Sequence, residues 1–511
     1  MRVLTATLAG LVAIWAIGAV RPTIALAAAC VDSPSPTTTV YLPNVTKTLG
    51  GRAGWVTPFV VQNTGSSPTD IEVSFYRFDD GALVTCRRVA GLAPATSYAD
   101  VPNDDPDLPD DTQFAVLVRS YGAPVAAVVN EQRGVGDATQ ASSYVGVSAG
   151  STTAYLPNVT RRFYGYGVPF IVQNVGAGTA SVAARFTSFD RTQGLTVPLS
   201  ILPGRAKAID PDFTAGLVDG TQYSVVVSSD QPVAVVANAH NEQGAPVAYA
   251  YNALTSGSRL LWAPFASGEQ SGFAGSSPVV VQNLGPNDSQ PTVTFFRRDG
   301  PCCAYVGAAQ WFGPVLKAGE SWVADPRFAP EAQGSTGSGP LAPGEYGLQV
   351  ASLPPGHPLP GDPTAGTIAA IVLPTSETTA MAYAAVPDTS LARASYLPNV
   401  TRQLGGPAGW TTLIALQGAY AFSGAATPAD GAILSFFRVA DGQLVTRYQV
   451  AFGGGATALV DPRGVPDLPD GGYAVVVSGL HGSLVAVVFE LATGGDSAMA
   501  YEGLPFEGPP Q

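Results

Sequence analysis

One stretch of sequence occurs four times along the chain, and this repetition sets the organisation of the whole protein. The first copy begins at Tyr41 with Tyr-Leu-Pro-Asn-Val-Thr and leads into Val-Val-Gln-Asn-Thr-Gly, which ends at Gly65. The other copies begin at Tyr155, Trp262 and Tyr396, so the starts lie 114, 107 and 134 residues apart. Each interval has the length of a small domain rather than of a solenoid repeat. We therefore expect four tandem modules, each with its own core.

Composition and alternation favour an all-β fold of antiparallel β-sandwiches. Gly (58) and Pro (44) supply many turns, and a hydrophobic content of 46% argues against disorder. Residues 71–75 alternate between apolar and polar, which is typical of a half-buried strand. Residues 114–118 and 125–129 are apolar on both faces, as in strands that are covered on both sides. The first module is predicted to contain strands at residues 38–45, 56–63, 71–78, 83–89, 97–101, 113–119, 125–130 and 142–147.

The repeat also places the module boundaries. The predicted sandwiches cover residues 38–148, 152–254, 258–387 and 393–505. The third is longer because of Gly- and Pro-rich loop insertions at 330–343 and 354–366. The connections are short, and we expect an elongated rod on the order of 130 to 160 Å long, because a ten-residue strand rises roughly 33 Å.

Residues 1–29 have the pattern of a secretory signal peptide: Arg2, an apolar stretch and a small-residue end at 25–29. Two alternatives stay open, an uncleaved N-terminal anchor and lipoprotein processing at Cys30. In an exported protein Cys30 and Cys86 could form a disulfide bond, provided that Cys30 is not lipidated. The adjacent Cys302 and Cys303 could be free, bonded to each other or bonded between molecules.

A strand that ends in Asn-x-Gly, an alternating strand, an Asp-Gly turn and a step such as Leu202-Pro-Gly204 follow one another in these modules. This order resembles immunoglobulin-like modules of bacterial surface proteins, including the cell-adhesion-related type. The resemblance implies tandem immunoglobulin-like β-sandwiches and a surface or adhesive role, without assigning a ligand. Two departures stand out: module two has Tyr164-Gly-Tyr166 where others carry Trp, and module four has Gln417-Gly418 in place of Gln-Asn.

Aromatic residues near the module starts are the first candidate binding residues. Trp55, Trp262 and Trp410 could stack on sugars, although core or inter-module packing is the more ordinary role because their spacing follows the module. Glutamines precede the Asn-x-Gly turns and could either form a repeated polar site or bond to backbone; they are Gln62, Gln173, Gln282 and Gln417.

The densest carboxylate run could hold Ca²⁺, because oxygen ligands suit this ion; it contains Asp104, Asp105, Asp107, Asp110 and Asp111. No EF-hand spacing is present, and Asp-Pro pairs are themselves turn formers. The triplets that begin at Asn44, Asn158 and Asn399 fit the glycosylation pattern. In a bacterial host we expect them to be ordinary strand positions.

The sequence has no His-Glu-x-x-His metal motif and no dinucleotide fingerprint, and His240 is expected in a loop. With three histidines and no Cys-x-x-Cys, metal-thiolate chemistry is not expected. A net charge of -13 argues against nucleic acid as a partner.

We therefore expect a non-catalytic, secreted or cell-surface protein without a cofactor, acting in adhesion or as a structural spacer of the envelope. Its partner would be a surface or matrix protein or a glycan, and its contact with a membrane would be through the N-terminus alone. A carbohydrate-binding array is the alternative, and an exported hydrolase is the least favoured hypothesis.

Overall fold

The computed structural model describes residues 35–51, 53–134, 139–241, 246–268, 273–300, 307–328, 340–356, 362–421, 423–424, 426–492 and 498–506. These residues form antiparallel sheets with a few three-residue 3₁₀ helices, so the all-β prediction is confirmed. The proposed signal segment, Cys30, Cys302, Cys303 and most of the two loop insertions lie outside the described residues.

Module one consists of eight strands in two sheets. One sheet has the order β1-β6-β3-β4 and the other the order β5-β2-β7-β8. The eight strands predicted from the sequence are all found, with ends that shift by a few residues. Their bounds are β1 (Thr38–Lys47), β2 (Phe59–Asn63), β3 (Thr69–Arg77), β4 (Leu83–Leu92), β5 (Ser97–Asp100), β6 (Thr112–Ser120), β7 (Val125–Arg133) and β8 (Gln140–Val145), with η1 (Pro102–Asp104) between β5 and β6.

Module two repeats this arrangement with one fusion. The counterparts of β6 and β7 form a single long strand, β15, which pairs in both sheets and joins them into one eight-stranded sheet. Its elements are β9 (Ser151–Arg161), β10 (Tyr166–Gly167), β11 (Phe170–Asn174), β12 (Ala180–Ser188), β13 (Gly194–Ile201), β14 (Ala206–Ile209), η3 (Pro211–Phe213), β15 (Thr221–Asn241) and β16 (Ala248–Asn252).

Modules three and four again have two sheets each. In both, the last strand of the module pairs with the module's first strand. Module three contains β17 (Leu260–Ser267), β18 (Val279–Asn283), β19 (Gln290–Arg297), β20 (Gly307–Phe312), β21 (Ser321–Ala324), β22 (Glu345–Leu353), β23 (Ile368–Val372), β24 (Tyr383–Ala384), β25 (Val386–Pro387) and η4 (Asp388–Ser390). Module four contains β26 (Ala394–Arg402), β27 (Thr411–Gly418), β28 (Gly431–Arg438), β29 (Leu444–Ala451), η5 (Gly454–Ala456), β30 (Thr457–Val460), η6 (Pro462–Gly464), β31 (Gly471–Leu480), β32 (Leu484–Leu491), β33 (Ala498–Glu502) and β34 (Leu504–Phe506).

The strand order corrects the immunoglobulin-like expectation. In an immunoglobulin constant domain, strands one, two, four and five share a sheet, and strands three, six and seven form the other. Here strands three and six share one sheet and strands two and five share the other, but strand one lies with three and six, and strand seven with two and five. Turn and alternation patterns do not encode this order, because they are local, whereas the pairing of strands one and six spans a whole module.

The Asn-x-Gly segments are turns, although the positive φ that both residue types tolerate is not used. The side-chain nitrogen of Asn63 donates to the carbonyls of Ser67 (2.9 Å) and Leu92 (2.8 Å), and its side-chain oxygen accepts from the backbone N–H of Gly65 (2.9 Å). Neither residue has a positive φ. Glycine is required because a Cβ at Gly65 would lie 2.5 Å from that of Ala123.

The second sheet of each module is apolar on both faces, and two modules share it. In β11, Phe170 and Val172 enter the core of module two, while Ile171 between them joins the core of module one. In β18, Val280 likewise joins the core of module two, and in β27, Ala415 joins that of module three. Both faces of these strands are therefore buried, as the apolar runs predicted.

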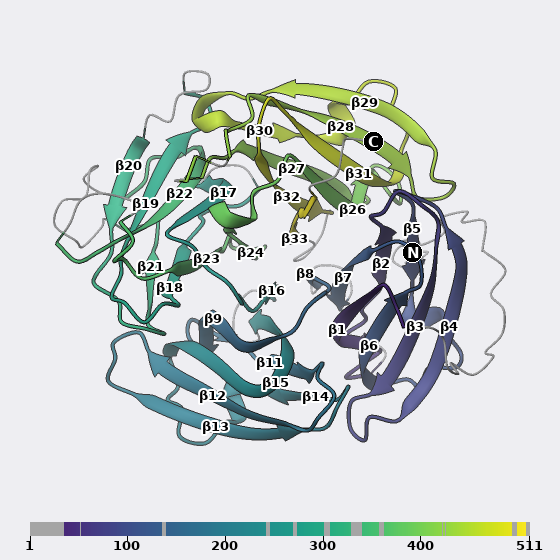
Figure 1. Ribbon diagram of the computed structural model, residues 1–511, viewed down its shortest axis with the longest axis horizontal. Coiled ribbons are helices and arrows are strands. Elements are labelled where there is room, and N and C mark those ends of the chain that lie inside the picture. Colours follow the sequence, from purple (N-terminus) through teal and green to yellow (C-terminus); the bar gives the residue numbers. More distant parts are fainter. Residues whose placement is uncertain are drawn as a thin grey trace, which may run out of the picture.

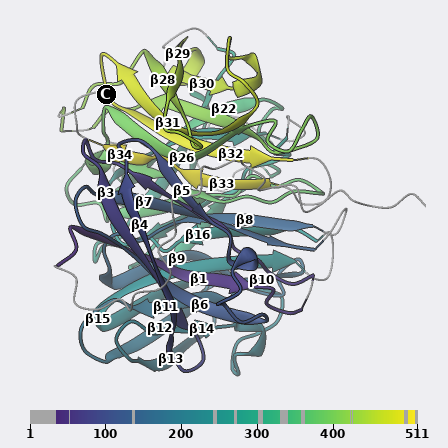
Figure 2. The same cartoon turned by 90° about the vertical axis from the view of Figure 1, so that its right-hand side faces the viewer.

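The second sheet of module one packs on the core of module four in the same way, so the four modules form a closed ring (Figure 1). Val128 and Val145 of module one belong to the core of module four, and the Ser143 hydroxyl donates to the carbonyl of Ala500 at 2.8 Å. The expected rod is therefore wrong. In a rod the outward apolar face of module one's second sheet would lie in water, and ring closure buries it. In the side view the strands of the modules run between the two faces of the ring (Figure 2).

We predict that a side chain directed at the neighbouring module contributes as much to the unfolding free energy as an ordinary core residue does. Ile171→Ala should cost about 2 to 4 kcal/mol of unfolding free energy, because it removes a fully packed side chain. Leu202→Ala in the same module should change stability by less than about 0.5 kcal/mol, since Leu202 is 57% exposed. The measurement is the guanidinium chloride midpoint of each variant. Equal, small effects would mean that no module covers this face.

Candidate functional site

One strand of each sandwich, namely β8, β16, β24 or β33, lies at the centre of the ring (Figure 1). Neighbouring strands among β8, β16, β24 and β33 contact one another there. A four-residue pattern, Ala-x-(Ala or Ser)-Tyr, recurs in or beside these strands and ends at Tyr144, Tyr251, Tyr383 and Tyr501. Sequence reasoning missed this pattern, although its recurrence is readable in the sequence. The small residues allow four strands to approach closely at the centre.

The tyrosine of this pattern holds the opening motif of its own module. Register shifts mark a β-bulge at the Pro-Asn of the motif in β1 and β26. In module four the Tyr501 hydroxyl donates to the backbone carbonyl of Asn399 (2.5 Å) and accepts from the backbone N–H of Asn399 (3.1 Å). Tyr144 bonds to Asn44 in the same way, at 2.7 and 3.1 Å. The bulge leaves backbone groups without ladder partners, and the tyrosine satisfies them.

The asparagines of the motif point inward rather than to solvent. Asn44, Asn158 and Asn399 are 4 to 8% exposed, and the Asn399 amide donates to both carboxylate oxygens of Glu490 at 2.8 and 2.9 Å. A glycan could not be attached to these side chains in the folded protein. The triplets are thus strand positions, as expected.

Two buried glutamates occupy equivalent places beside these asparagines, Glu131 in β7 and Glu490 in β32. Glu131 accepts hydrogen bonds from Asn44 (2.5 Å), Ser142 (2.9 Å) and Asn238 of module two. Burial raises the pKa of Glu131 to about 7, although these three hydrogen bonds oppose the shift. Burial raises the pKa of Glu490 to about 8, against the bonds from Asn399. Both glutamates lie at a seam, the contact between two neighbouring modules. Proton uptake by Glu131 and Glu490 is therefore coupled to the packing of the ring.

In modules two, three and four the aromatic residue that opens the motif bonds to the next module in the ring. The Tyr155 hydroxyl donates to the carbonyl of Leu284 (3.1 Å), which lies inside the Asn-x-Gly turn of module three. The Tyr396 hydroxyl donates to that of Thr64 in the corresponding turn of module one (2.8 Å). In module three the indole of Trp262 donates to the carbonyl of Tyr420 (3.0 Å). The two halves of the repeated motif thus meet across the seams.

Two of the three tryptophans proposed for sugar stacking are buried. Trp262 is 0% exposed and Trp410 is 5% exposed. Trp55 is half-buried, and the Arg133 guanidinium lies 5.8 Å from its ring centre. Packing, the alternative kept for these side chains, accounts for the positions of Trp262 and Trp410.

The repeated glutamines do not form a surface site either. All four are 0% exposed, and Gln282 donates to the carbonyl of Gly319 at 3.1 Å and to that of Val225 in module two at 3.5 Å. Gln417 likewise donates to the carbonyl of Gly455 at 3.4 Å. The side-chain amides of Gln62 and Gln173 are buried without a hydrogen-bond partner among the described residues.

The acidic run of module one is engaged locally. Asp105 pairs with Arg87, Asp110 lies 3.2 Å from Lys47, and Asp111 accepts from the Gly50 amide at 2.8 Å. Within the part of the chain that the structure describes, no three His, Cys, Asp or Glu side chains form a group that could hold a metal ion. The calcium site proposed for Asp104, Asp105, Asp107, Asp110 and Asp111 finds no support in this geometry.

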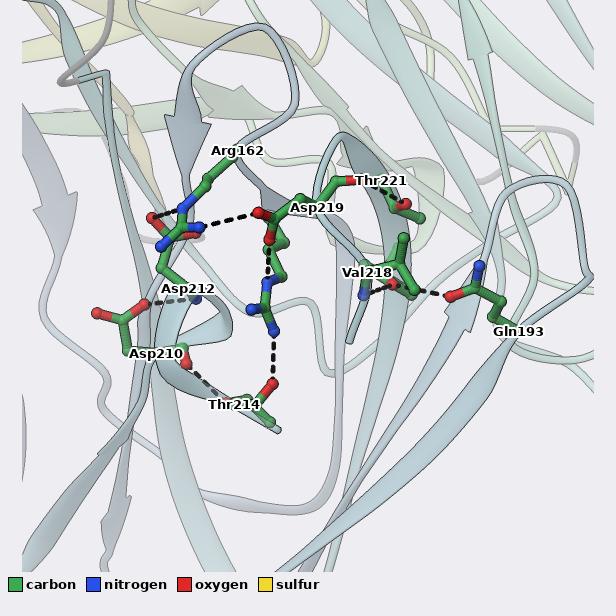
Figure 3. A network of polar contacts seen from close by, with 10 residues as sticks. Arg162, Gln193, Asp210, Asp212, Thr214, Val218, Asp219 and Thr221 are labelled. Carbon is green, nitrogen blue, oxygen red and sulfur yellow. Dashed lines mark hydrogen bonds and ion pairs between the residues drawn. The ribbon is translucent and has the colours of Figure 1, made fainter. Parts of the chain in front are cut away.

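Module two has the most extensive polar network at the corresponding end of its sandwich (Figure 3). Arg162 pairs with Asp219 (2.9 Å) and Asp212 (3.7 Å). Arg161 also pairs with Asp219 (2.6 Å) and donates to the carbonyl of Thr214 (2.6 Å). The network fixes the turn after β9 against the loop between β14 and β15. His240, expected in a loop, instead lies within β15.

Cys86 takes part in a disulfide bond. It is the only cysteine among the described residues. Its partner is therefore one of Cys30, Cys302 and Cys303, and the proposed pairing with Cys30 stays a prediction.

No family model and no curated protein matches the chain. A crystal structure of Thermotoga maritima 1070 aligns with 21% of this chain and 96% of its own, at 17% identity and a TM-score of 0.19. A tetra-tandem repeat from the extending region of a large adhesion protein aligns with 86% of this chain and 93% of its own, at 12% identity and a TM-score of 0.11. Neither score is high enough to establish a shared fold.

Among the described residues, no helix has the length and apolar character needed to cross a membrane.

Glu490 predicts a pH dependence of stability. Its pKa rises from 4.5 in the unfolded chain to about 8 in the fold, so the folded state binds the proton more tightly. The stabilisation is complete below pH 4.5 and is lost as the pH rises through 8, a loss on the order of 3 to 5 kcal/mol. Glu490→Gln should unfold at a midpoint that changes less between pH 5 and 9 than that of the wild type. The exposed Glu377→Gln should keep the wild-type pH dependence, and an unchanged slope in Glu490→Gln would contradict the account.

The disulfide predicts a specific cross-linked peptide. Proteolysis without reduction, followed by mass spectrometry, should recover a peptide that joins Cys86 to Cys30, and reduction should separate it. A lipid on Cys30, or a link from Cys86 to Cys302 or Cys303, would overturn this pairing.

Proposed function

We propose that the protein is an exported, non-catalytic component of the outer cell surface that acts in adhesion or as a structural element of the envelope. The observation that carries the proposal is a closed ring whose conspicuous polar and aromatic repeat residues are used to hold modules together. Such a ring is a rigid support, because each module is fixed by two neighbours. Its loops at the two faces remain available for contact with other molecules.

Export is supported by the signal-like residues 1–29 and by the disulfide at Cys86. Disulfide bonds persist in oxidising compartments and are rare in the cytosol. Cleavage, lipidation and retention of the N-terminus are alternatives with different products. All three place the ring outside the cytoplasm.

The absence of catalysis is supported by where the best candidate groups lie. Glu131 and Glu490 are each 2% exposed and enclosed by the seams. A cavity of about 10 Å³ beside Glu490 has room for about one water molecule; it is lined by Asn130, Gln132, Asn399, Thr401, Leu404, Trp410, Glu490 and Met499. A substrate could not reach these carboxylates without opening the ring. A hydrolase therefore remains the least favoured hypothesis.

The test is fractionation of the native host with an antibody against the ring. The proposal expects the protein in the medium or on the cell surface, with a mature N-terminus at or after residue 28, or with a lipid on Cys30. Surface proteolysis of intact cells should remove any attached fraction. Recovery of full-length protein in the cytosol would overturn the proposal.

A further inference from the structure

The exposed aromatic side chains of the described chain gather on two adjacent modules. Tyr164 is 80% exposed, Phe213 is 85% exposed and Phe328 is 62% exposed. The first two belong to module two and the third to module three. Other exposed large apolar residues of the described chain are aliphatic, such as Leu83 and Leu444. The rest of the structure buries its aromatic rings at least in part, so these three call for a reason.

The fold does not require an aromatic ring at these places. Strand pairing aligns the start of η3 with those of η1 and η6, so Phe213 corresponds to Asp104 in module one and to Gly464 in module four. Phe328 occupies the same place in module three, after Asp-Pro and one further residue. Two of four modules thus build the same turn without a ring. The aromatic residues are additions to the turn rather than parts of its packing.

Tyr164 adds a cost in backbone conformation. Its φ is +50°, in the left-handed region, whereas Gly50 and Gly405 stand at the matching place after the first strand in modules one and four. A residue with a Cβ is disfavoured there, and the 80% exposed ring packs edge-on against the neighbouring Phe163, with ring centres 4.6 Å apart. Strain of this kind is found mostly at functional positions. A binding role would account for it.

The charges around these rings are paired with one another. Arg162, two residues before Tyr164, pairs with Asp212, next to Phe213, and with Asp219. In module three Arg327 pairs with Asp325 at 2.6 Å, and its guanidinium lies 5.6 Å from the ring centre of Phe328. Each of these arginines has a local carboxylate partner, and the chain carries a net charge of -13, so the surface does not attract an anionic partner. The surface suits a neutral ligand.

The two modules meet at this surface. Tyr166 of module two and Val323 of module three pack against the same core cluster. Tyr164 lies two residues before Tyr166, and Phe328 lies on the turn that follows the strand of Val323. Phe213 lies in the other loop of the network joined by Arg162. The three rings are thus carried by loops of two adjacent modules that meet at one seam.

We propose that Phe213, Tyr164 and Phe328 form a row of stacking platforms for an extended neutral polysaccharide. Aromatic faces offer a large apolar contact to the faces of sugar rings, and a row of them matches a polymer of repeating units. The fixed arginines and aspartates between the rings would bond to sugar hydroxyls. The proposal rests on the surface role proposed above and gives it a ligand class, at a place other than the tryptophans.

The test is affinity electrophoresis of the full-length protein in gels that contain hydroxyethyl cellulose, laminarin, xylan, galactomannan or glycol chitin. The variants take their residues from the other modules: Phe213→Asp, Tyr164→Gly, Phe328→Gly and the triple change. Wild-type protein should be retarded by at least one polysaccharide, and each single change should weaken binding about tenfold or less, with the triple change abolishing it. Leu444→Ala, at a 42% exposed position on β29, is the matched control.

Thermal unfolding of each variant shows whether it is folded. The variants should have melting temperatures close to that of the wild type, and Tyr164→Gly should not lower it, because glycine relieves the backbone strain. Migration of wild-type protein unaffected by all five gels, or equal retardation of the triple variant and the control, would overturn the proposal. Loss of retardation in the triple variant, with retardation kept in the Leu444→Ala control, would support the proposal. Fractionation of the host is independent of these outcomes, so failure of glycan binding and failure of the surface role can be told apart.

Discussion

The burial of both faces of each module's second sheet is the constraint on which the rest of the structure depends. Strands such as β11 alternate between two cores, with Phe170 inside module two and Ile171 against module one. A linear array would cover this face for three modules and leave it open in the first. Contact between modules four and one removes that exposed surface, and Val128 and Val145 lie within it. Burial of apolar area therefore selects a ring.

The repeated motif makes this packing specific. Its bulge is held by a buried tyrosine from the central strand, as Tyr501 holds Asn399. Its first aromatic residue reaches the Asn-x-Gly turn of the next module, as Tyr396 reaches Thr64. One sequence element thus contributes to the core, to the central strand and to the seam. Since buried polar groups must be paired, a module in another position would leave several of them unsatisfied.

The strands could be predicted because their alternation is local, but the half-buried strand expected at 71–75 is buried on both faces. Glu72 and Ser74 are 3% and 1% exposed, and Glu72 pairs with Arg119 at 2.9 Å, a partner that alternation does not reveal. The apolar runs at 114–118 and 125–129 correctly indicated two covered faces, but not which element covers the second. For 125–129 that partner belongs to another module, because Val128 lies in the core of module four, and no local pattern identifies it. The tryptophans were visible as candidates, whereas the exposed rings stood out in sequence only where Tyr164 departs from the repeat.

The central claim, closure of the ring, is tested most directly by small-angle X-ray scattering of the mature protein in solution. A compact particle of this length has a radius of gyration of about 23 Å. Four sandwiches in a rod of the length expected from their strands would give about 40 Å. The ring predicts a value near the compact one, with a maximum dimension well below the rod's length. An extended profile at low concentration would contradict closure.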